Sequence, residues 1–206
     1  MGFYENRILP VLVDKGCGTP PFRGQRKKIV PLASGRVLEV GMGSGHNIRH
    51  YDPEKVEFVW GLEPSAGMRR RAQANLAAAP FEVKWLDLPG EEIPLDDESV
   101  DTVLLTFTLC TIPHAARALG QMRRVLKPDG RLLFCEHGAA PDAGVRKWQD
   151  RLNPLWRRIA GGCNINRGIP RLIEAAGFAI EKLESAYLPD TPRIAAYNYL
   201  GIANRG

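Results

Sequence analysis

Three glycines at alternating positions, Gly41, Gly43 and Gly45, form the feature of this sequence with the clearest chemical meaning. They end a short apolar run, and glycine lets the backbone turn tightly and come close to a ligand. We expect a helix to follow the loop, and a glycine-rich turn that leads from a strand into a helix offers free N–H groups to an anionic or polar group. Glu63 follows Gly41 by 22 residues, near the spacing at which an acid accepts ribose hydroxyls in nucleotide-binding sheets. These residues therefore favour a ligand that carries a ribose.

The residues after the glycines narrow the choice of ligand. The pattern G-x-G-x-G differs from the dinucleotide pattern G-x-G-x-x-G. His46 and Asn47 stand where a last small residue would allow close helix packing, which disfavours NAD and FAD. The sequence contains no G-x-x-x-x-G-K-[ST], so a phosphate loop for nucleoside triphosphates is disfavoured as well.

Three further residues are candidates for chemistry. His137 follows a predicted strand on the ligand side of the sheet, where it could act as a general base or bond a backbone group, and both interpretations stay open. Cys110 is expected to be a small buried hydrophobe, because free cysteine usually is. Asp101 is expected to cap a neighbouring loop rather than to act in catalysis.

The four cysteines predict neither a disulfide framework nor a metal site. They lie far apart, with no C-x-x-C pair and no histidine at zinc-finger spacing. Free thiols in a reducing, cytoplasmic compartment are therefore expected. The positions are Cys17, Cys110, Cys135 and Cys163.

Five short apolar runs predict buried strands, and helical patterns lie between them. Such alternation implies an α/β fold with a mostly parallel sheet and helices on both faces, and ligands bind at the carboxyl ends of its strands. The predicted strands are Arg36–Gly41, Val56–Gly61, Phe81–Leu86, Val100–Phe107 and Arg131–Glu136, and the predicted helices are Ser65–Ala78 and His114–Leu126.

The rest of the chain is expected to decorate that sheet. Residues 3–30 predict one or two helices, and residues 139–164 form a basic insertion that carries tryptophan. Gly168–Gly177 predicts a helix, and Phe178–Tyr187 and Ile194–Ala203 predict two closing strands.

Composition indicates an ordinary globular domain. The 206 residues are 44% hydrophobic and 25% charged, which excludes disordered and low-complexity classes. No apolar run approaches the roughly 20 residues of a transmembrane helix. The first 18 residues carry acidic and basic side chains inside their apolar stretch, so a signal peptide is not expected. The net charge of +5 permits an anionic partner without naming one.

The glycine loop with its preceding acid, Glu39, and the later Glu63 resembles a class I S-adenosylmethionine-dependent methyltransferase. The likeness extends into Gly90–Ile112 and Arg123–Gly138, which are similar to the small-molecule branch of methyltransferase type 11, with ubiquinone/menaquinone-type and alkyl-thiol methyltransferase-like proteins. The tail motifs W-Q-D-x-L-N-P-x-W and G-C-N at residues 148–156 and 162–164 resemble the thiol branch. The membrane-bound thiol methyltransferases of that branch carry an apolar N-terminal anchor, which this sequence does not show.

The resemblance implies a Rossmann-like, doubly wound seven-stranded sheet with an antiparallel last strand, in a single domain over residues 1–206. Within it, we expect N-terminal lid helices at 1–30, a cofactor-binding core at 31–138, a cap insertion at 139–164 and closing elements at 165–206. S-adenosyl-L-methionine is the implied cofactor. The residues implied to bind it are Glu39, Gly41, Gly43, Gly45, Asn47, Glu63, Pro64, Asp87, Leu88, Gly90, Glu91, Thr106, Phe107 and Tyr4.

Within that set, Glu63 would accept both ribose hydroxyls, while Asp87 and Glu91 are alternative partners for the adenine. The acceptor is expected to be a small apolar molecule: a thiol, a phenol or quinol, or an amine. A phenol would need a base, for which His137 is the candidate. Trp148 and Trp156 would shape the acceptor pocket from the cap, with the lid completed by residues 3–22.

Two alternatives remain, one among enzymes and one from a different functional class. A nucleic-acid amino-group methyltransferase would carry [ND]-P-P-[YF] where this sequence has T-F-T-L at 106–109, so no nucleic-acid partner is expected. A binding protein without catalysis is less favoured, because the glycine loop and Glu63 are intact. The basic clusters at 23–28 and 146–158 are interpreted as solvated faces of the lids, and they permit weak contact with a membrane surface. The sequence specifies no oligomeric state.

Overall fold

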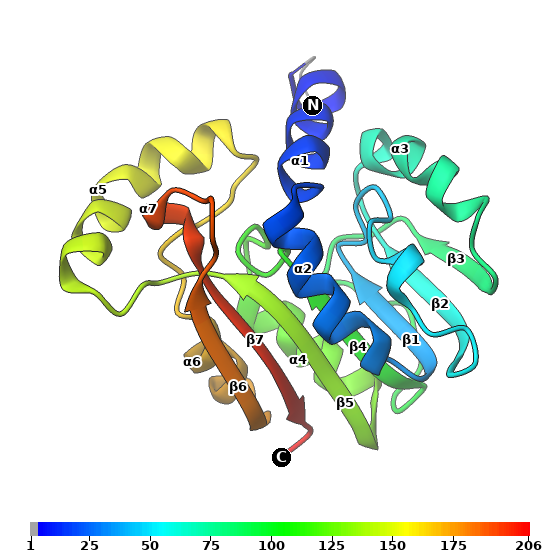
Figure 1. Ribbon diagram of the computed structural model, residues 1–206. Coiled ribbons are helices and arrows are strands. Elements are labelled where there is room, and N and C mark those ends of the chain that lie inside the picture. The colour runs from blue at the N-terminus through cyan, green and yellow to red at the C-terminus, as the bar shows by residue number, and fades with distance from the viewer. Residues whose placement is uncertain (1–3) are drawn as a thin grey trace.

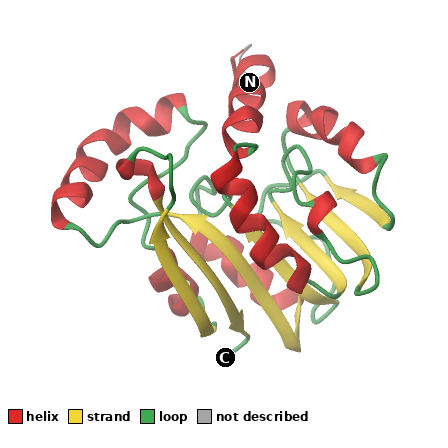
Figure 2. Cartoon of the chain, viewed as in Figure 1, coloured by secondary structure: helices red, strands yellow, loops and turns green. Residues whose placement is uncertain are grey.

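The computed structural model describes residues 4–206 and contains one seven-stranded sheet flanked by helices (Figures 1 and 2). Phe3, which the sequence places at the start of the lid, lies outside the described residues. The strand order is β3-β2-β1-β4-β5-β7-β6. The strands are β1 (Gly35–Val40), β2 (Val56–Leu62), β3 (Glu82–Leu86), β4 (Val100–Thr106), β5 (Leu126–His137), β6 (Ala179–Tyr187) and β7 (Tyr197–Asn204).

Strands β1 to β5 pair in parallel, whereas β7 is antiparallel to both β5 and β6. The expected doubly wound α/β class with an antiparallel last strand is confirmed. The order reverses at β1, since β2 and β3 lie on one side of it and β4 and β5 on the other. Ligands bind at this switch point, outside the carboxyl ends of the strands, in sheets of this kind.

Helices cover both faces of the sheet, and two apolar clusters form the core. On one face, α4 (Ala115–Val125) and α6 (Ile169–Ala175) pack against strand residues such as Leu105 and Phe134. On the other, α2 (Pro20–Ile29) and α3 (Ala66–Leu76) pack against residues such as Leu104 and Leu133. The remaining elements are a π-helix (Tyr4–Ile8), α1 (Leu9–Cys17), 3₁₀ turns at Val30–Leu32 and Ile48–His50, α5 (Ala143–Ile159) and α7 (Arg193–Ala196).

Two predicted local structures are wrong. The glycine loop leads into the short 3₁₀ turn Ile48–His50 and not into an α-helix. The reason is that Asn47 and Tyr51 both bond the buried carboxylate of Glu39 beneath the loop, which fixes this segment as a tight turn. The closing segment expected as a strand from Ile194 instead begins with α7, where Ala195 N donates to Pro192 O at 2.8 Å, and the strand starts at Tyr197.

Helix α1 projects from the top of α2 above the carboxyl edge of β1, while α5 lies at the far side of the molecule beyond β7 (Figure 1). The end of α5 nevertheless contacts the N-terminal segment, because the hydroxyl of Tyr4 donates to Ile159 O at 2.6 Å. The segments expected to form the lid therefore meet.

Candidate active site

The glycine loop leaves β1 through three residues with left-handed backbone. Gly41, Gly43 and Gly45 have φ values of 71°, 59° and 76°, a region that side chains disfavour. At Gly41 there is no room either, because a Cβ there would lie 2.1 Å from Cγ2 of Thr108. The loop therefore needs glycine both for its conformation and for its contact with the end of β4.

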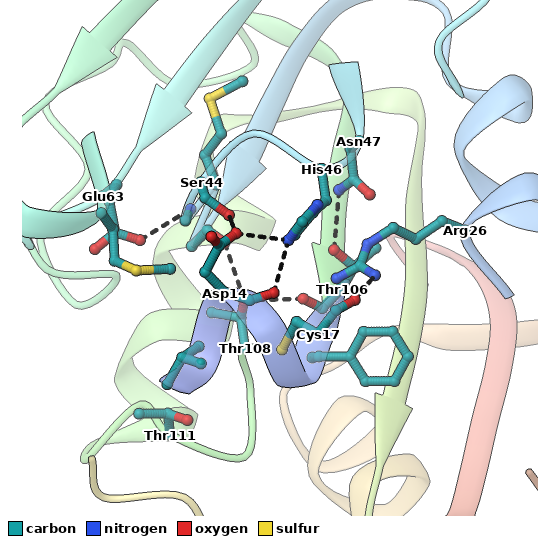
Figure 3. Close-up of a pocket in the computed structure, with 16 residues that line it drawn as sticks. Asp14, Cys17, Arg26, Ser44, His46, Asn47, Glu63, Thr106, Thr108 and Thr111 are labelled. Atoms are coloured by element: carbon teal, nitrogen blue, oxygen red, sulfur yellow. Dashed lines mark hydrogen bonds and ion pairs between the residues drawn. The ribbon is translucent and has the colours of Figure 1, made fainter. Parts of the chain in front are cut away.

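Glu63 lies at the end of β2, directly beside this loop (Figure 3). Its carboxylate accepts hydrogen bonds from Gly43 N at 3.0 Å and from Ser65 N at 2.8 Å. Burial raises the pKa of Glu63 above its ordinary value, although both of these hydrogen bonds work in the opposite direction. The side chain is 8% exposed and lines the cavity described below.

A buried polar network connects the loop to β4. The carboxylate of Glu39 accepts from Asn47 Nδ2 at 2.9 Å and from the Tyr51 hydroxyl at 2.6 Å, and complete burial raises the pKa of Glu39 to about 7. Asn47 Nδ2 also donates to Thr106 Oγ1 at 2.9 Å (Figure 3). The other amide atom, Asn47 Oδ1, is buried and has no hydrogen-bond partner among residues 4–206.

These residues line a cavity of about 160 Å³ at the switch point of the sheet (Figure 3). Its floor is the glycine loop and the end of β4, with Thr106, Phe107 and Thr108. Its roof comes from α1 and α2, through Val13, Asp14, Cys17 and Arg26.

Asp14 holds α1 onto the glycine loop. Its Oδ1 accepts from Ser44 Oγ at 2.6 Å and lies 2.9 Å from Nε2 of His46, and its Oδ2 accepts from Arg71 of α3 at 2.5 Å. Partial burial works to raise the pKa of Asp14, but the hydrogen bonds from Ser44 and Arg71 lower it overall. Burial lowers the pKa of His46. A carboxylate therefore fastens the lid at the cavity wall.

The position of Arg26 shows that one interpretation of the sequence, a fully solvated basic cluster, is wrong. The basic cluster at 23–28 was expected to be a solvated face, but Arg26 is only 4% exposed and faces the cavity (Figure 3). It donates to Cys17 O at 2.6 Å and its guanidinium lies 5.1 Å from the ring centre of Phe107. The Nε atom of Arg26 is buried and has no hydrogen-bond partner, and the Arg26 guanidinium forms no salt bridge within the described part of the chain. A buried, unpaired cation on a cavity wall is suited to an anionic ligand.

Phe107 turns the chain away from β4 with a φ of 57°, which is rare for a non-glycine residue. Its amide donates to Cys135 O at 2.9 Å and its ring packs edge-on against Phe22 of α2, 4.6 Å between centres. Residues with strained backbone are common at functional sites, where packing and hydrogen bonds of the surrounding residues stabilise the strained conformation.

Several predicted cofactor residues lie outside this cavity. Glu91 is buried and accepts from His114 N at 3.0 Å, at the start of α4, while Asp87 forms a two-pronged ion pair with Arg69. Gly90 packs between Ile112 and Val40. Pro64 is exposed and Leu88 is half-buried. Their assignment to the adenine side remains a prediction.

The predicted lid and cap residues differ in how they lie. Tyr4 reaches Ile159 of α5 and does not line the cavity. Trp148 is 56% exposed, with the guanidinium of Arg151 over its ring at 5.6 Å. Trp156 packs inward against Cys110, Cys163 and Ile165. The assignment of both tryptophans to the acceptor pocket remains a prediction, and only Trp156 lies with its side chain packed inward.

His137 lies at the end of β5, and its Nε2 is 3.2 Å from Cys163 Sγ. Burial works to lower the pKa of His137, but the hydrogen bond with Cys163 raises it overall. Asp101 accepts from Arg36 N at 2.8 Å and pairs with Lys127, which matches the structural role expected for it.

The sequence alone missed Asp14, Ser44 and Arg26 as residues of the cavity. Ser44 stands inside the glycine motif, so its position was a usable signal. Asp14 and Arg26 belong to helices whose packing on the sheet no local pattern specifies. Their contribution becomes visible only when α1 and α2 are placed over the carboxyl edge.

The cavity suits the cofactor that the resemblance implies. The methionyl part of that cofactor carries an ammonium group and a carboxylate. The unpartnered Asn47 Oδ1 offers a hydrogen-bond acceptor that suits the ammonium, and the buried guanidinium of Arg26 offers a cation that suits the carboxylate. The left-handed glycines leave the space that a side chain would otherwise fill. Glu63 supplies a carboxylate for hydroxyl groups beside them.

Comparison with known proteins gives the same family. Residues 38–134 match the family model described as a methyltransferase domain. Human thiol S-methyltransferase TMT1B is 33% identical over 174 residues, which cover 79% of this chain and 70% of that protein. The ubiquinone/menaquinone biosynthesis C-methyltransferase UbiE of Geotalea daltonii is 29% identical over 138 residues, covering 65% of this chain and 57% of that protein.

The fold is shared with solved structures. An S-adenosylmethionine-dependent methyltransferase from Mesorhizobium loti superposes with a TM-score of 0.66 at 19% identity, covering 91% of this chain and 98% of that one. The chain spans 62–70% of the length of four thiol S-methyltransferases that it matches. Among the described residues, no helix combines the length and apolarity needed to cross a membrane.

Proposed function

The chain belongs to the class I S-adenosylmethionine-dependent methyltransferases, in their small-molecule branch, and on this premise we propose that it methylates the sulfur of a small apolar thiol. The observation that carries the proposal is the convergence of Glu63, Asn47 and the glycine loop on one cavity roofed by α1 and α2. The similarity to thiol S-methyltransferases supports sulfur as the methylated atom.

S-adenosylmethionine, when bound, supplies a methyl group already activated on a sulfonium. The residues of this chain would hold and shield it. Glu63 would accept hydrogen bonds from the ribose hydroxyls, Asn47 Oδ1 would accept from the methionyl ammonium, and Arg26 would neutralise the methionyl carboxylate. The methyl group would pass from the sulfonium to the acceptor sulfur, with the electron pair of the broken bond left on the donor sulfur and the thiol proton released to solvent.

Little further chemistry is asked of the protein. Alignment of two reactants and exclusion of water supply much of the acceleration for such a displacement. A thiol needs only stabilisation of its thiolate, whereas a phenol needs a base. His137, the candidate base, has its Nε2 engaged with Cys163 Sγ, and this supports a thiol over a phenol.

The lids carry an apolar surface that suits such acceptors. Among the described residues, most of the exposed large apolar side chains lie on the N-terminal segment and on α5. They are Tyr4, Ile8, Leu12, Trp148, Leu152, Leu155 and Ile159. On α5 they alternate with Arg151, Arg157 and Arg158. An apolar stripe beside basic side chains favours the surface of an anionic membrane, so we propose weak contact there and entry of the acceptor from it.

Two further points belong to this proposal. A cytoplasmic location is supported by the four free cysteines, which suit a reducing compartment. A role without nucleic acid is supported by the T-F-T-L sequence that stands in place of the amino-methylase motif.

Vesicles of anionic and of zwitterionic phospholipid test the proposed membrane contact of the N-terminal segment and α5. Binding to the anionic vesicles should fall in Leu155→Glu, whereas Leu183→Glu, at another exposed leucine, is the control and should bind as the parent protein does.

A transfer assay with labelled cofactor tests the activity. The panel contains apolar thiols, quinols, phenols and amines, and we expect turnover with thiols only. Glu63→Ala should weaken cofactor binding in calorimetry, and Glu57→Ala, an exposed acid of the same strand, should not. Turnover with phenols alone would overturn the assignment of sulfur, and unchanged cofactor binding in Glu63→Ala would overturn the site.

A further inference from the structure

A second cluster of reactive side chains lies outside the cofactor cavity. Sγ of Cys110, a ring nitrogen of His137 and Sγ of Cys163 all lie within 4.8 Å of one another. The contact between Cys163 Sγ and His137 Nε2 is 3.2 Å. The three residues are 27 and 26 positions apart in the sequence, and they come together only because the chain returns twice to the same edge of the sheet.

The backbone around the cluster is held firmly. Asn164 donates through its amide N and through Nδ2 to Cys110 O, each at 2.9 Å, and so fixes the loop of Cys163 to the loop of Cys110. Glu136, next to His137, accepts from Thr108 N and Leu109 N through one carboxylate oxygen. The cluster is thus positioned by hydrogen bonds that leave the three ligand atoms directed at one another.

The cluster is nearly closed to solvent and packs in part against apolar side chains. Cys110 is 2% exposed, and Cys163 and His137 are 9% exposed. Ile165 and Trp156 pack against the two cysteines. Two thiols and an imidazole in such surroundings form the soft donor set that selects zinc-class metals over hard cations.

We propose that Cys110, His137 and Cys163 bind a divalent zinc-class metal ion through Sγ, Nε2 and Sγ, with the fourth position left to a ligand from outside the chain. Tetrahedral zinc, with bonds of about 2.3 Å to sulfur and about 2.0 Å to nitrogen, places its ligand atoms roughly 3.5–3.8 Å apart. The 3.2 Å between Cys163 Sγ and His137 Nε2 lies just below that range, and the other two separations do not exceed 4.8 Å. Binding displaces both thiol protons to solvent, and the two thiolates then balance the charge of the metal.

The cluster adjoins the cofactor cavity through Thr111. Cys110 is followed by Thr111, whose hydroxyl lies 3.5 Å from Cys110 Sγ and which lines the cofactor cavity. Three protein ligands with one open position are the arrangement of catalytic rather than structural zinc. Resting on the proposed function, the open position would take the sulfur of the acceptor thiol, because metal coordination deprotonates a thiol outright.

Metal binding itself is the test, measured without cofactor or acceptor so that it stands apart from activity. The full chain is stripped with a chelator, reduced with a phosphine and titrated with Zn²⁺ against a chromophoric chelator, and then with Co²⁺. We expect one metal per chain and a thiolate-to-cobalt charge-transfer band. Cys163→Ser and Cys110→Ser should raise Kd by more than the roughly 10–100-fold that loss of an outer partner costs.

Cys135→Ser is the matched control, because Cys135 is a fully buried thiol that contacts Asn198 and lies outside the cluster. It should bind Zn²⁺ like the parent protein. Absence of binding by the reduced parent, or equal affinity in Cys163→Ser, overturns the proposal. If a serine variant fails to fold, the cobalt spectrum of the parent decides: no thiolate band, or a Cys110–Cys163 disulfide that persists in the reductant, overturns it as well.

Discussion

Asp14 and Ser44 connect the N-terminal lid to the glycine loop through a hydrogen bond of 2.6 Å. The same carboxylate contacts His46 and Arg71, so α1, the loop and α3 meet at one side chain. A single half-buried acid therefore connects the cavity roof to the loop and to α3. Its removal should affect the lid before it affects the sheet.

We expect Asp14→Ala to lower the free energy of unfolding by about 1.5–3 kcal/mol, the usual effect of losing hydrogen bonds to a charged group. Amide hydrogens of α1 should exchange faster, while those of β4 keep their protection. Hydrogen exchange by mass spectrometry measures both. Asp52→Ala is the control, because the Asp52 carboxylate pairs with Lys55 and accepts from Glu54 N, both close to it in sequence and away from α1. Unchanged exchange of α1 would contradict this role for Asp14.

Gly41→Ala should destabilise the protein and abolish cofactor binding, because the new Cβ would lie 2.1 Å from Thr108 in a left-handed backbone. The expected loss exceeds the roughly 1–3 kcal/mol typical of strained backbone alone. Gly120→Ala is the matched variant, since Gly120 lies within α4 with nothing within 4 Å of a Cβ. It should stabilise the protein by roughly 0.5–1 kcal/mol. Denaturant titration of both variants checks the contrast.

Glu39 should make stability fall as pH rises. Its pKa is 4.5 ordinarily and about 7 in the folded chain, so between these values the unfolded state ionises while the folded state keeps the proton. The folded state thus loses up to about 3 kcal/mol over this window, at about 1.4 kcal/mol per pKa unit. Glu39→Gln lacks this loss.

The difference in free energy of unfolding between the parent and Glu39→Gln, measured at several values from pH 4 to pH 8, isolates the effect. The free energy of unfolding of Glu39→Gln should rise relative to that of the parent as pH increases, and the difference should become constant above the pKa of Glu39 in the folded chain. Glu57→Gln, at an exposed position of β2, should show no such trend. Parallel curves for parent and Glu39→Gln would rule out a raised pKa.

Arg26→Gln should weaken cofactor binding about 10–100-fold, the range expected when a buried charge-assisted hydrogen bond of about 1.5–3 kcal/mol is lost. The effect should appear in Kd and KM for the cofactor more than in kcat. Arg23→Gln removes a neighbouring exposed guanidinium that donates to Gly18 O, and this variant should bind the cofactor normally. Calorimetry on both proteins checks the comparison. Equal affinities would show that the charge of Arg26 serves packing alone.

The sheet was predictable because short apolar runs that form buried strands, and glycines that end them, can be recognised from neighbouring residues in the sequence. The runs at Val56 and Val100 matched strands closely, and Gly41 marked the site through its spacing to Glu63. The helix expected after the glycine loop was not found, since the side chains of Asn47 and Tyr51 serve a buried acid that no periodicity reveals.

The rest depended on contacts between distant parts of the chain. Arg26 was interpreted as solvated because its neighbours are basic, whereas the packing of α2 on the sheet buries it. Cys110, His137 and Cys163 gave no metal motif, because such motifs are recognised by short spacings and these residues are brought together by topology. Local patterns therefore located the glycine loop that lines the cavity but not the Cys110–His137–Cys163 cluster.

The placement of Asp14 on the roof has a kinetic consequence. Under the proposed function, the bonds that would close the cavity around the donor would also close it around the demethylated product, and we expect release to require that α1 lifts from Ser44. Tighter attachment of α1 would then keep water out but lengthen the residence time of the product. We therefore expect the N-terminal helix to set the rate of turnover, and the residues at the carboxyl edge of the sheet to set the identity of the cofactor.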